Sequence, residues 1–470
     1  MRVLLLNPPG ERIYIRDYFC SKTTKSNYLF HPVDLVVLSG TAAEEHDVEV
    51  LDCMAERLEP GAAAARIDAA FGGAGPDVIV SLVGSVSWDE DRAFLAAQHA
   101  RGRRILAIGD VLHEASEKRL AEEPWLEAAL HVFANRDLIH YLRGERDLVE
   151  DMTVRGADDV GGGGSIERLL RVERRHRKGE TRVPRPRHEL FPEHGYHFSF
   201  AKQERFATVL TDYGCPYPCT FCVIGTLGFQ TRPVADALEE IDALRSRGIH
   251  ELFFMDQTFG VVRERALELC AALEQRGDLS WTAFTRPDTG DDELLSAMRR
   301  AGCHTVILGV ESAEDELLAL YKKGYAAAKV TEGFRRAKRH GLRTVGTFII
   351  GLPEETEDSL AKTLELAIQL DMDFMSLNMA VPRFGTPFRK RALELGLARE
   401  DDLVMDQGGE DAFLPTSTLD RERMLALKKR MVRRFYLRPS YLWRRFKSAA
   451  SLYELRAQAR EGLALLRRNV

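Results

Sequence analysis

The chain has 470 residues, of which 45% are hydrophobic and 29% are charged, and its formal net charge at pH 7 is −6. These proportions exclude a disordered chain, and the length predicts more than one domain. No apolar run approaches the roughly 18 to 20 residues that cross a bilayer, and the first residues lack a signal peptide's length and cleavage site, so we expect a cytoplasmic protein.

The first 150 residues alternate short apolar runs with longer amphipathic stretches. Such buried runs separated by crossover helices are typical of a doubly wound, Rossmann-like parallel sheet. Ligands of this fold bind at the carboxyl ends of the strands, so the loops that follow them are candidate binding loops. The predicted strands cover residues 3–6, 48–51, 78–83, 105–108 and 130–133.

Residues 151–190 are predicted to be a linker between two domains. Gly161 to Gly164, followed by Ser165, have the composition of a flexible linker, and the stretch 171–187 is basic and contains several prolines. The alternative is a surface loop within one domain. We place a boundary here because the alternation of strands and helices restarts beyond it.

Residues 191–400 predict six βα units, which describe a partial (β/α)6 barrel better than an open sheet. Barrel enzymes work at the carboxyl ends of their strands, so we expect the chemistry directly after each strand. The helices are predicted at 234–247, 263–275, 291–301 and 330–340. The strands are predicted at 207–211, 251–255, 281–284, 305–309, 344–350 and 374–379.

Three of the seven cysteines lie within eight positions, directly after the first strand of this barrel. Cys215, Cys219 and Cys222 have the spacing C-x3-C-x2-C, which can hold one face of an iron–sulfur cubane and leave one iron without a protein ligand. A structural zinc site usually takes a second C-x2-C pair, which the sequence lacks, and a catalytic thiol or chance spacing is a further alternative. The scattered cysteines are expected to be ordinary buried thiols: Cys20, Cys53, Cys270 and Cys303.

The three cysteines, with Phe221 before the last of them, resemble the signature of the radical S-adenosylmethionine (SAM) superfamily. Nearly the whole chain resembles the branch whose members carry an N-terminal cobalamin-binding domain. The resemblance implies that Cys215, Cys219 and Cys222 hold three irons of a 4Fe-4S cluster. The fourth iron is then expected to bind SAM and cleave it reductively to methionine and a 5′-deoxyadenosyl radical.

The same resemblance implies SAM contacts directly after successive barrel strands. Relatives contact the methionine amino group after the second strand, the ribose and carboxylate after the third and fourth, and adenine along the fifth. Each such residue alone could be structural, and their order along the barrel joins them. The candidate SAM-binding residues are Phe221, Asp256, Thr258, Arg286, Glu311, Ser312 and Gly351.

For the N-terminal domain the resemblance implies bound cobalamin. The histidine motif D-x-H-x-x-G is absent, because Asp110 and His113 are misspaced, so we expect cobalamin without histidine ligation or a domain that has lost it. His113 is expected to be a solvated loop residue. The candidate cobalamin contacts are Asn7, Ser85, Gly109 and Asn135.

Residues 401–470 are predicted to form a helical C-terminal domain, with helices at 424–434 and 448–468. Between them, residues 435–446 mix aromatic and cationic side chains. This pattern is typical of an amphipathic lid over the barrel or of a peripheral membrane contact that collects a lipid substrate. A nucleic-acid partner is the least favoured interpretation.

The resemblance favours cobalamin-dependent methyl transfer to an unactivated carbon. The alternatives are radical cyclisation, rearrangement or carbon–carbon coupling on a lipid or other hydrophobic substrate, and a non-catalytic iron–sulfur or cobalamin-binding regulator. A tRNA-thiomethylating enzyme is disfavoured because the first domain lacks the additional cysteines. The expected partners are a small-molecule or lipid substrate and an electron donor such as flavodoxin or ferredoxin.

Overall fold

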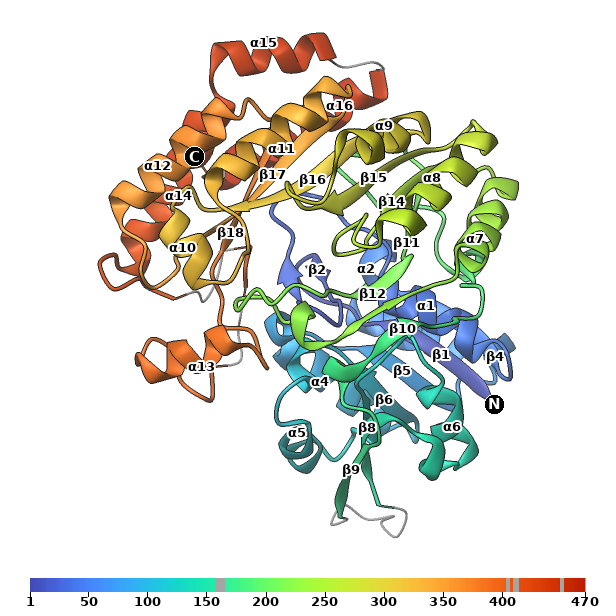
Figure 1. The fold of residues 1–470 in the computed structure, drawn as a ribbon. Helices are drawn as coiled ribbons and strands as arrows, with labels where there is room; N and C mark the ends of the chain where they lie inside the picture. Colours follow the sequence, from blue (N-terminus) through green and yellow to red (C-terminus); the bar gives the residue numbers. More distant parts are fainter. Residues whose placement is uncertain (157–164, 403–405, 409–413, 449–451, 470) are drawn as a thin grey trace.

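The computed structural model describes residues 1–156, 165–402, 406–408, 414–448 and 452–469. These residues form an N-terminal α/β domain, an open barrel and a set of C-terminal helices (Figure 1). The α/β class and both predicted architectures are confirmed. No helix among the described residues has the length and apolar character needed to cross a bilayer.

The N-terminal domain is built on a seven-stranded sheet of order β4-β1-β5-β6-β7-β8-β9. The first five of these strands are parallel, and β8 and β9 add an antiparallel edge. The strands are β1 (Arg2–Asn7), β4 (Asp47–Asp52), β5 (Val78–Leu82), β6 (Arg104–Ile108), β7 (Ala128–Leu130), β8 (Asp151–Arg155) and β9 (Ile166–Leu170). The helices are α1 (Val33–Ala42), α2 (Cys53–Glu56), α3 (Pro60–Ala69), α4 (Trp88–His99), α5 (Ser116–Glu122) and α6 (Asp137–Arg143).

The predicted linker over 151–190 is corrected by this sheet. β8 and β9 pair with each other and continue the sheet past residue 150, so the glycine-rich segment connects two strands of one domain. Gly161 to Gly164 themselves lie outside the described residues. Further along, β10 (Lys178–Glu180) pairs with β13 (Phe229–Thr231), which places part of the predicted linker against the barrel domain.

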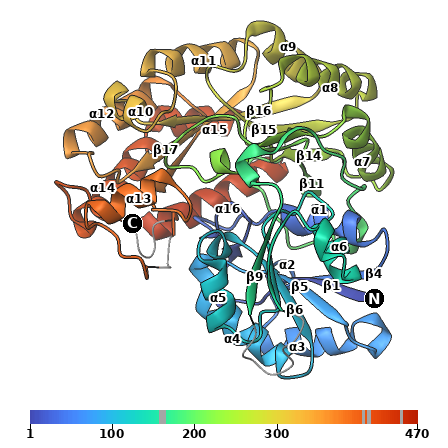
Figure 2. The same ribbon diagram turned by 60° about the horizontal axis from the view of Figure 1, so that its bottom comes forward.

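The second domain is a partial barrel of six parallel strands in sequential order, with β11 at one edge and β18 at the other. Helices cover its outer face in both views (Figures 1 and 2). The strands are β11 (Phe206–Val209), β14 (Glu251–Phe254), β15 (Ser280–Thr285), β16 (Cys303–Glu311), β17 (Arg343–Ile350) and β18 (Phe374–Met379). The helices are α7 (Val234–Ser246), α8 (Arg263–Arg276), α9 (Asp292–Arg300), α10 (Asp315–Leu320), α11 (Ala327–Arg339) and α12 (Glu357–Gln369).

One of the hydrophobic clusters contains residues of both domains. All ten residues of α1 are buried, because the helix belongs to a cluster that also contains inward-facing barrel residues such as Phe253, Ile307 and Val345. A segment of the N-terminal domain, with the hairpin of β2 (Tyr14–Ile15) and β3 (Lys22–Thr23), contributes to this cluster. The inner face of the barrel is therefore closed by the N-terminal domain.

The C-terminal helices cover the free edge of the barrel. The Tyr436 hydroxyl, at the end of α14, accepts a hydrogen bond from the Met375 amide at 3.0 Å and donates one to its carbonyl at 2.6 Å. Pairing of this kind satisfies the backbone of the edge strand β18, which would otherwise be open. These helices are α13 (Pro387–Glu394), α14 (Arg421–Tyr436), α15 (Pro439–Ser448) and α16 (Leu452–Asn469).

Candidate active site

The cysteine loop lies between two short strands, β12 (Asp212–Gly214) and β13, at the carboxyl end of β11. Gly214 has φ +78°, and a Cβ there would lie 2.0 Å from the Gly228 carbonyl oxygen, so only glycine allows the two strands to approach this closely. Across the loop, the Thr220 amide donates to the Tyr321 carbonyl at 3.1 Å and the Phe388 amide donates to the Thr220 carbonyl at 3.1 Å. The loop is therefore fixed at both ends and in its middle.

The three thiols of the loop are half-buried, whereas Cys53, Cys270 and Cys303 are buried as expected for core thiols. Burial raises the pKa of Cys215, which neighbouring Cys219 raises further, and burial raises the pKa of Cys222 to about 12. Protons therefore occupy the Cys215 and Cys222 thiols in the absence of metal, and metal binding would release them.

These thiols are not arranged as ligands of a single ion. Among the described residues, no three His, Cys, Asp or Glu side chains converge as ligands of one metal ion would. A cubane differs in this respect, because each thiolate binds a separate iron.

A buried ion pair lies beside the cysteine loop. The Lys323 ammonium donates to Glu311 Oε1 at 2.7 Å, and both side chains are about one-tenth exposed. Burial lowers the pKa of Lys323, but Glu311, Tyr325 and Cys219 outweigh burial and raise it above its ordinary value. The Lys323 ammonium lies 5.7 Å from the ring centroid of Phe221, so the cation is close to the cysteine loop. Glu311 Oε2 has no hydrogen-bond donor within reach among the described residues.

The local backbone brings this ion pair to the end of β16. Glu311 has φ +64° and follows a register shift in the pairing of β16 with β17. This irregularity interrupts the regular alternation of side chains between the two faces of the strand. A Cβ on Gly309 would lie 2.6 Å from Glu311 Oε1 and 2.9 Å from Lys323 Nζ. Glycine at 309 therefore leaves the space that the ion pair occupies.

Arg286 connects the end of β15 to the cysteine loop. Its guanidinium stacks on Tyr217, 3.7 Å from the ring centroid, and lies 4.8 Å from the centroid of Tyr325. It also donates to Asp288 at 2.8 and 2.9 Å and to the Lys323 carbonyl at 2.9 Å. The structure thus connects Arg286 and Glu311 through Lys323, a residue that the sequence did not single out.

Lys323, Tyr325 and Tyr217 are the functional candidates that sequence reasoning missed. Lys323 and Tyr325 follow α10 and not a strand, so a search of strand ends passes over them. The signal that could have found them is a pair of lysines between two tyrosines in the short loop between α10 and α11.

The two SAM candidates that follow β14, Asp256 and Thr258, make different contacts. The Thr258 hydroxyl hydrogen bonds to Cys215 and lowers the pKa of that thiol against the effect of burial. The Asp256 carboxylate is fully buried and accepts hydrogen bonds from the Thr211 amide at 2.6 Å, the Thr211 hydroxyl at 2.5 Å and the Asp212 amide at 3.2 Å. Asp256 therefore positions the peptide that leads into the cysteine loop.

The remaining SAM candidates lie around the barrel mouth. Phe221 is half-buried between Tyr321 and Lys323, and Ser312 is buried with its hydroxyl accepting a hydrogen bond from the Glu314 amide at 3.2 Å. Gly351 follows β17 with φ +91°. The Glu355 carboxylate accepts hydrogen bonds from the Gly351 amide at 2.5 Å and the Leu352 amide at 3.0 Å, which shapes this loop.

Glu355 makes stability depend on pH. Burial raises its pKa from an ordinary 4.5 to about 8, although the amides of Gly351 and Leu352 oppose the shift. Between these values the folded protein retains a proton that the unfolded chain has lost, so the free energy of unfolding falls as pH rises, by up to about 1.4 kcal/mol per pH unit. We expect the melting temperature of Glu355→Gln, relative to that of the unmodified protein, to increase between about pH 5 and about pH 8. Parallel pH profiles for the two proteins would refute this assignment.

The candidate cobalamin contacts divide into two groups. Three of them lie at the carboxyl ends of β1, β5 and β6, as predicted: Asn7, Ser85 and Gly109. The Asn7 amide already donates to Asp52 at 2.9 Å, and the Ser85 hydroxyl donates to Asp110 at 3.0 Å. Asn135 instead lines a surface pocket of about 350 Å³ whose other lining residues do not include these three.

His113 is half-buried, not solvated as expected. Its Nε2 contacts the Tyr18 carbonyl, and Nδ1 lies 2.9 Å from the Arg174 guanidinium. Burial lowers the pKa of His113 to about 3, and Arg174 adds to that effect. Both imidazole nitrogens are therefore in use within the protein, so His113 is not positioned to bind cobalt.

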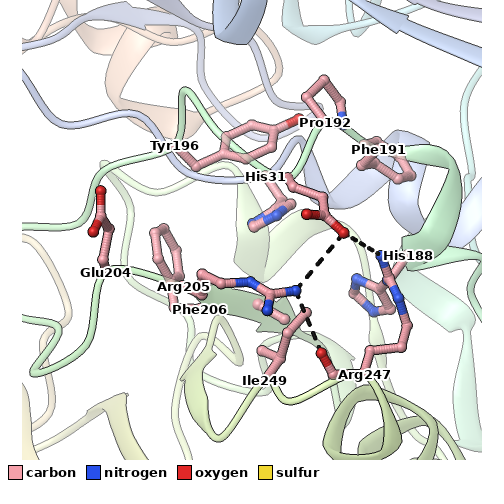
Figure 3. Close-up of a pocket in the computed structure, with 12 residues that line it drawn as sticks. His31, His188, Phe191, Pro192, Tyr196, Glu204, Arg205, Phe206, Arg247 and Ile249 are labelled. Atoms are coloured by element: carbon pink, nitrogen blue, oxygen red, sulfur yellow. Dashed lines mark hydrogen bonds and ion pairs between the residues drawn. The ribbon is translucent and has the colours of Figure 1, made fainter.

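A separate small pocket lies at the start of β11, at the other end of the strand from the cysteine loop (Figure 3). His31 stacks on Tyr196 with ring centroids 3.9 Å apart, and Glu193 pairs with Arg205 at 3.8 Å and Arg247 at 4.0 Å. The cavity measures about 30 Å³, which is space for about one water molecule. We assign these contacts to the interface between the N-terminal domain and the barrel.

Comparisons with known proteins agree with this arrangement. Residues 209–367 match the model of the Radical SAM superfamily. An uncharacterized methyltransferase of Pyrococcus horikoshii is 29% identical over an alignment that covers 94% of each chain.

Solved structures show the same fold over the whole chain. The radical S-adenosylmethionine methyltransferase TsrM of Kitasatospora setae, solved with cobalamin and a 4Fe-4S cluster bound, has a TM-score of 0.71 at 17% identity and covers 100% of this chain and 99% of its own. The cobalamin-dependent S-adenosylmethionine radical enzyme OxsB has a TM-score of 0.68 at 16% identity, covering 99% of this chain and 71% of its own.

Proposed function

Because residues 209–367 match the model of the Radical SAM superfamily, we propose that this chain is a cobalamin-dependent methyltransferase that cleaves SAM reductively at a 4Fe-4S cluster. The observation that carries the proposal is the fixed loop of three half-buried thiols at the mouth of an open parallel barrel, beside the Lys323–Glu311 ion pair. The likeness of the entire chain to cobalamin-dependent relatives supports it.

The residues at the barrel mouth fit a cluster with one open iron. Three thiols on one loop are three thiolate ligands, one fewer than the irons of a cubane. When bound, the cluster, SAM and cobalamin would supply an electron, a 5′-deoxyadenosyl radical and a transferable methyl group. The electron would come from a reduced flavodoxin or ferredoxin.

The protein's own residues would orient SAM. Glu311 Oε2 faces no donor among the described residues and is free to accept a hydrogen bond from the ammonium or ribose hydroxyls of SAM. Lys323 holds that carboxylate in position through Oε1, and Arg286 holds Tyr217 of the cysteine loop in place. Accurate placement is essential, because a misplacement of about 1 Å is costly to a transfer reaction.

We place cobalamin at the carboxyl edge of the N-terminal sheet, facing the barrel. Buried polar contacts fix the loops at this edge: Arg16 pairs with Asp91 at 2.7 Å, and Asp110 binds the hydroxyls of Ser21 and Ser85. Because these side chains already bond to one another, we expect the backbone atoms of the loops to contact the bound cobalamin. The occupied nitrogens of His113 support cobalamin bound without that imidazole as a ligand.

The function is tested with reconstituted protein, a reductant, SAM with a deuterated methyl group and a metabolite extract. We expect 5′-deoxyadenosine together with a product in which CD3 replaces hydrogen. Formation of 5′-deoxyadenosine with a product that has only lost hydrogen would favour cyclisation. Absence of both products would favour the alternative of a non-catalytic iron–sulfur or cobalamin-binding regulator.

We also propose that α15 contacts a membrane surface. Leu442, Trp443 and Phe446 are 52, 60 and 64% exposed, and Lys447 lies 4.7 Å from the Trp443 ring centroid. Exposed aromatic and basic residues on one helix favour the interface of an anionic bilayer. We expect the protein to sediment with phosphatidylserine vesicles, and the double variant Trp443→Ala/Phe446→Ala to sediment less. Equal sedimentation of the two proteins would contradict this contact.

A further inference from the structure

Lys25 reaches from the N-terminal domain to the inner face of the barrel. Its ammonium donates to Ser376 Oγ at 3.1 Å and to Asn378 Oδ1 at 2.6 Å. Both partners lie on β18, whose alternate residues Met375 and Leu377 pack into the core beneath the outer helices. Because side chains alternate along a strand, Ser376 and Asn378 face inward.

The ammonium of Lys25 has no counter-ion among the residues that the structure describes. The nearby Asp406 carboxylate is bonded to Thr23, by its hydroxyl at 2.6 Å and its amide at 3.2 Å. Burial lowers the pKa of Lys25 well below its ordinary value, and the cations of Lys428 and Lys22 lower it further. A carboxylate placed beside Lys25 would therefore favour the charged form of its amine.

The hydrogen bonds at Lys25 leave a donor available. An ammonium has three N–H groups, and Ser376 and Asn378 accept from two of them. The Asn378 amide nitrogen donates to the Phe348 carbonyl at 3.2 Å, which fixes its oxygen toward Lys25. Lys25, Ser376 and Asn378 are all half-buried, so part of this group remains accessible.

Aromatic side chains belong to the hydrophobic cluster at this inner face of the barrel. Phe374, on the same face of β18 as Ser376, lies 5.0 Å from Phe200 between ring centroids, and Phe253 of β14 packs against Phe30 at 5.7 Å. A ligand that matches the region would combine one negative group with an apolar body.

We propose that Lys25 is a substrate-binding residue that pairs with the carboxylate of an apolar carboxylic acid. This inference rests on the proposed function, because it assigns a substrate class to the region where the N-terminal domain meets the inner face of the barrel. The carboxylate would take the third N–H of Lys25 and supply a negative charge. Ser376 and Asn378 would hold the ammonium in position for it.

The test compares two probes of the same shape, the charged 3-phenylpropionate and the uncharged 3-phenylpropionamide. Calorimetry measures how tightly each binds to the reconstituted protein. We expect the carboxylate to bind at least ~10-fold more tightly than the amide, as charge-assisted hydrogen bonds imply. Lys25→Met is expected to lose this preference, and the exposed control Lys178→Met to retain it. Equal binding, no binding of either probe, or a preference that survives in Lys25→Met would overturn the inference.

A second variant, Asn378→Asp, keeps the test decisive if Lys25→Met fails to fold. It places a carboxylate of nearly the same shape beside Lys25, so we expect it to remove the preference while leaving the melting temperature equal or higher. Neither measurement needs a reductant or turnover. A protein that prefers the carboxylate but yields no 5′-deoxyadenosine would refute the proposed function alone, and the reverse result would refute this inference alone.

Discussion

Replacing Cys219 with Ala is expected to abolish the iron–sulfur cluster and all cleavage of SAM. The loop is held at Thr220 by hydrogen bonds to Tyr321 and Phe388, which fix the backbone beside Cys219. With two ligands remaining, a cubane would have two irons without protein ligands. Iron and sulfide content and 5′-deoxyadenosine formation are the measurements.

Cys270→Ala is the matched control, because Cys270 is a fully buried thiol on α8. Its loss removes core packing and lowers stability by roughly 1 kcal/mol, with the cluster retained. A Cys219→Ala protein that keeps its cluster and cleaves SAM would show that the ligands have been misassigned.

The second large effect is expected at Glu311. Glu311→Gln removes the negative charge that pairs with Lys323 and that we assign to SAM, and it leaves a buried cation without its partner. We expect SAM to bind ~10- to 100-fold more weakly, because charged hydrogen bonds contribute about 1.5 to 3 kcal/mol each. Equilibrium binding of SAM to the reconstituted protein measures this loss.

Glu274→Gln serves as the control for this variant. Glu274 pairs with Arg300 at 3.1 Å on the exposed surface, where an ion pair contributes little. Cluster content should be unchanged in both variants. Unaltered SAM affinity in Glu311→Gln would show that this carboxylate does not contact SAM and serves only to balance Lys323.

The barrel was predictable from sequence because several of its strands are buried on both faces. Such strands are near-continuous apolar runs: β14 is buried at every residue, and the predicted strand at 251–255 begins where β14 begins and ends one residue after it. In the N-terminal sheet the signal was weaker. β7 begins with two alanines, and β9 (Ile166–Leu170) carries charged residues on an exposed edge, so neither strand stands out from its surroundings.

The candidate site was predictable only where chemistry follows a strand. Arg286 and Glu311 occupy strand ends, and the structure joins them through Lys323, which comes after a helix. Hydrogen bonding within the fold could not be read from the sequence either. Asp256 and Asn7 lie where they were expected, yet their polar atoms are used by neighbouring residues, a property of tertiary structure alone.

The central claim is that three thiolates leave one iron of the cluster free to bind SAM. It is tested most directly by pulsed electron–nuclear double resonance on the reduced protein, with SAM carrying oxygen-17 in its carboxylate. We expect an oxygen-17 coupling that appears with labelled SAM and is lost in Cys219→Ala. A reduced cluster whose spectrum is unaffected by SAM, or purified protein that holds only tetrahedral zinc, would contradict the account.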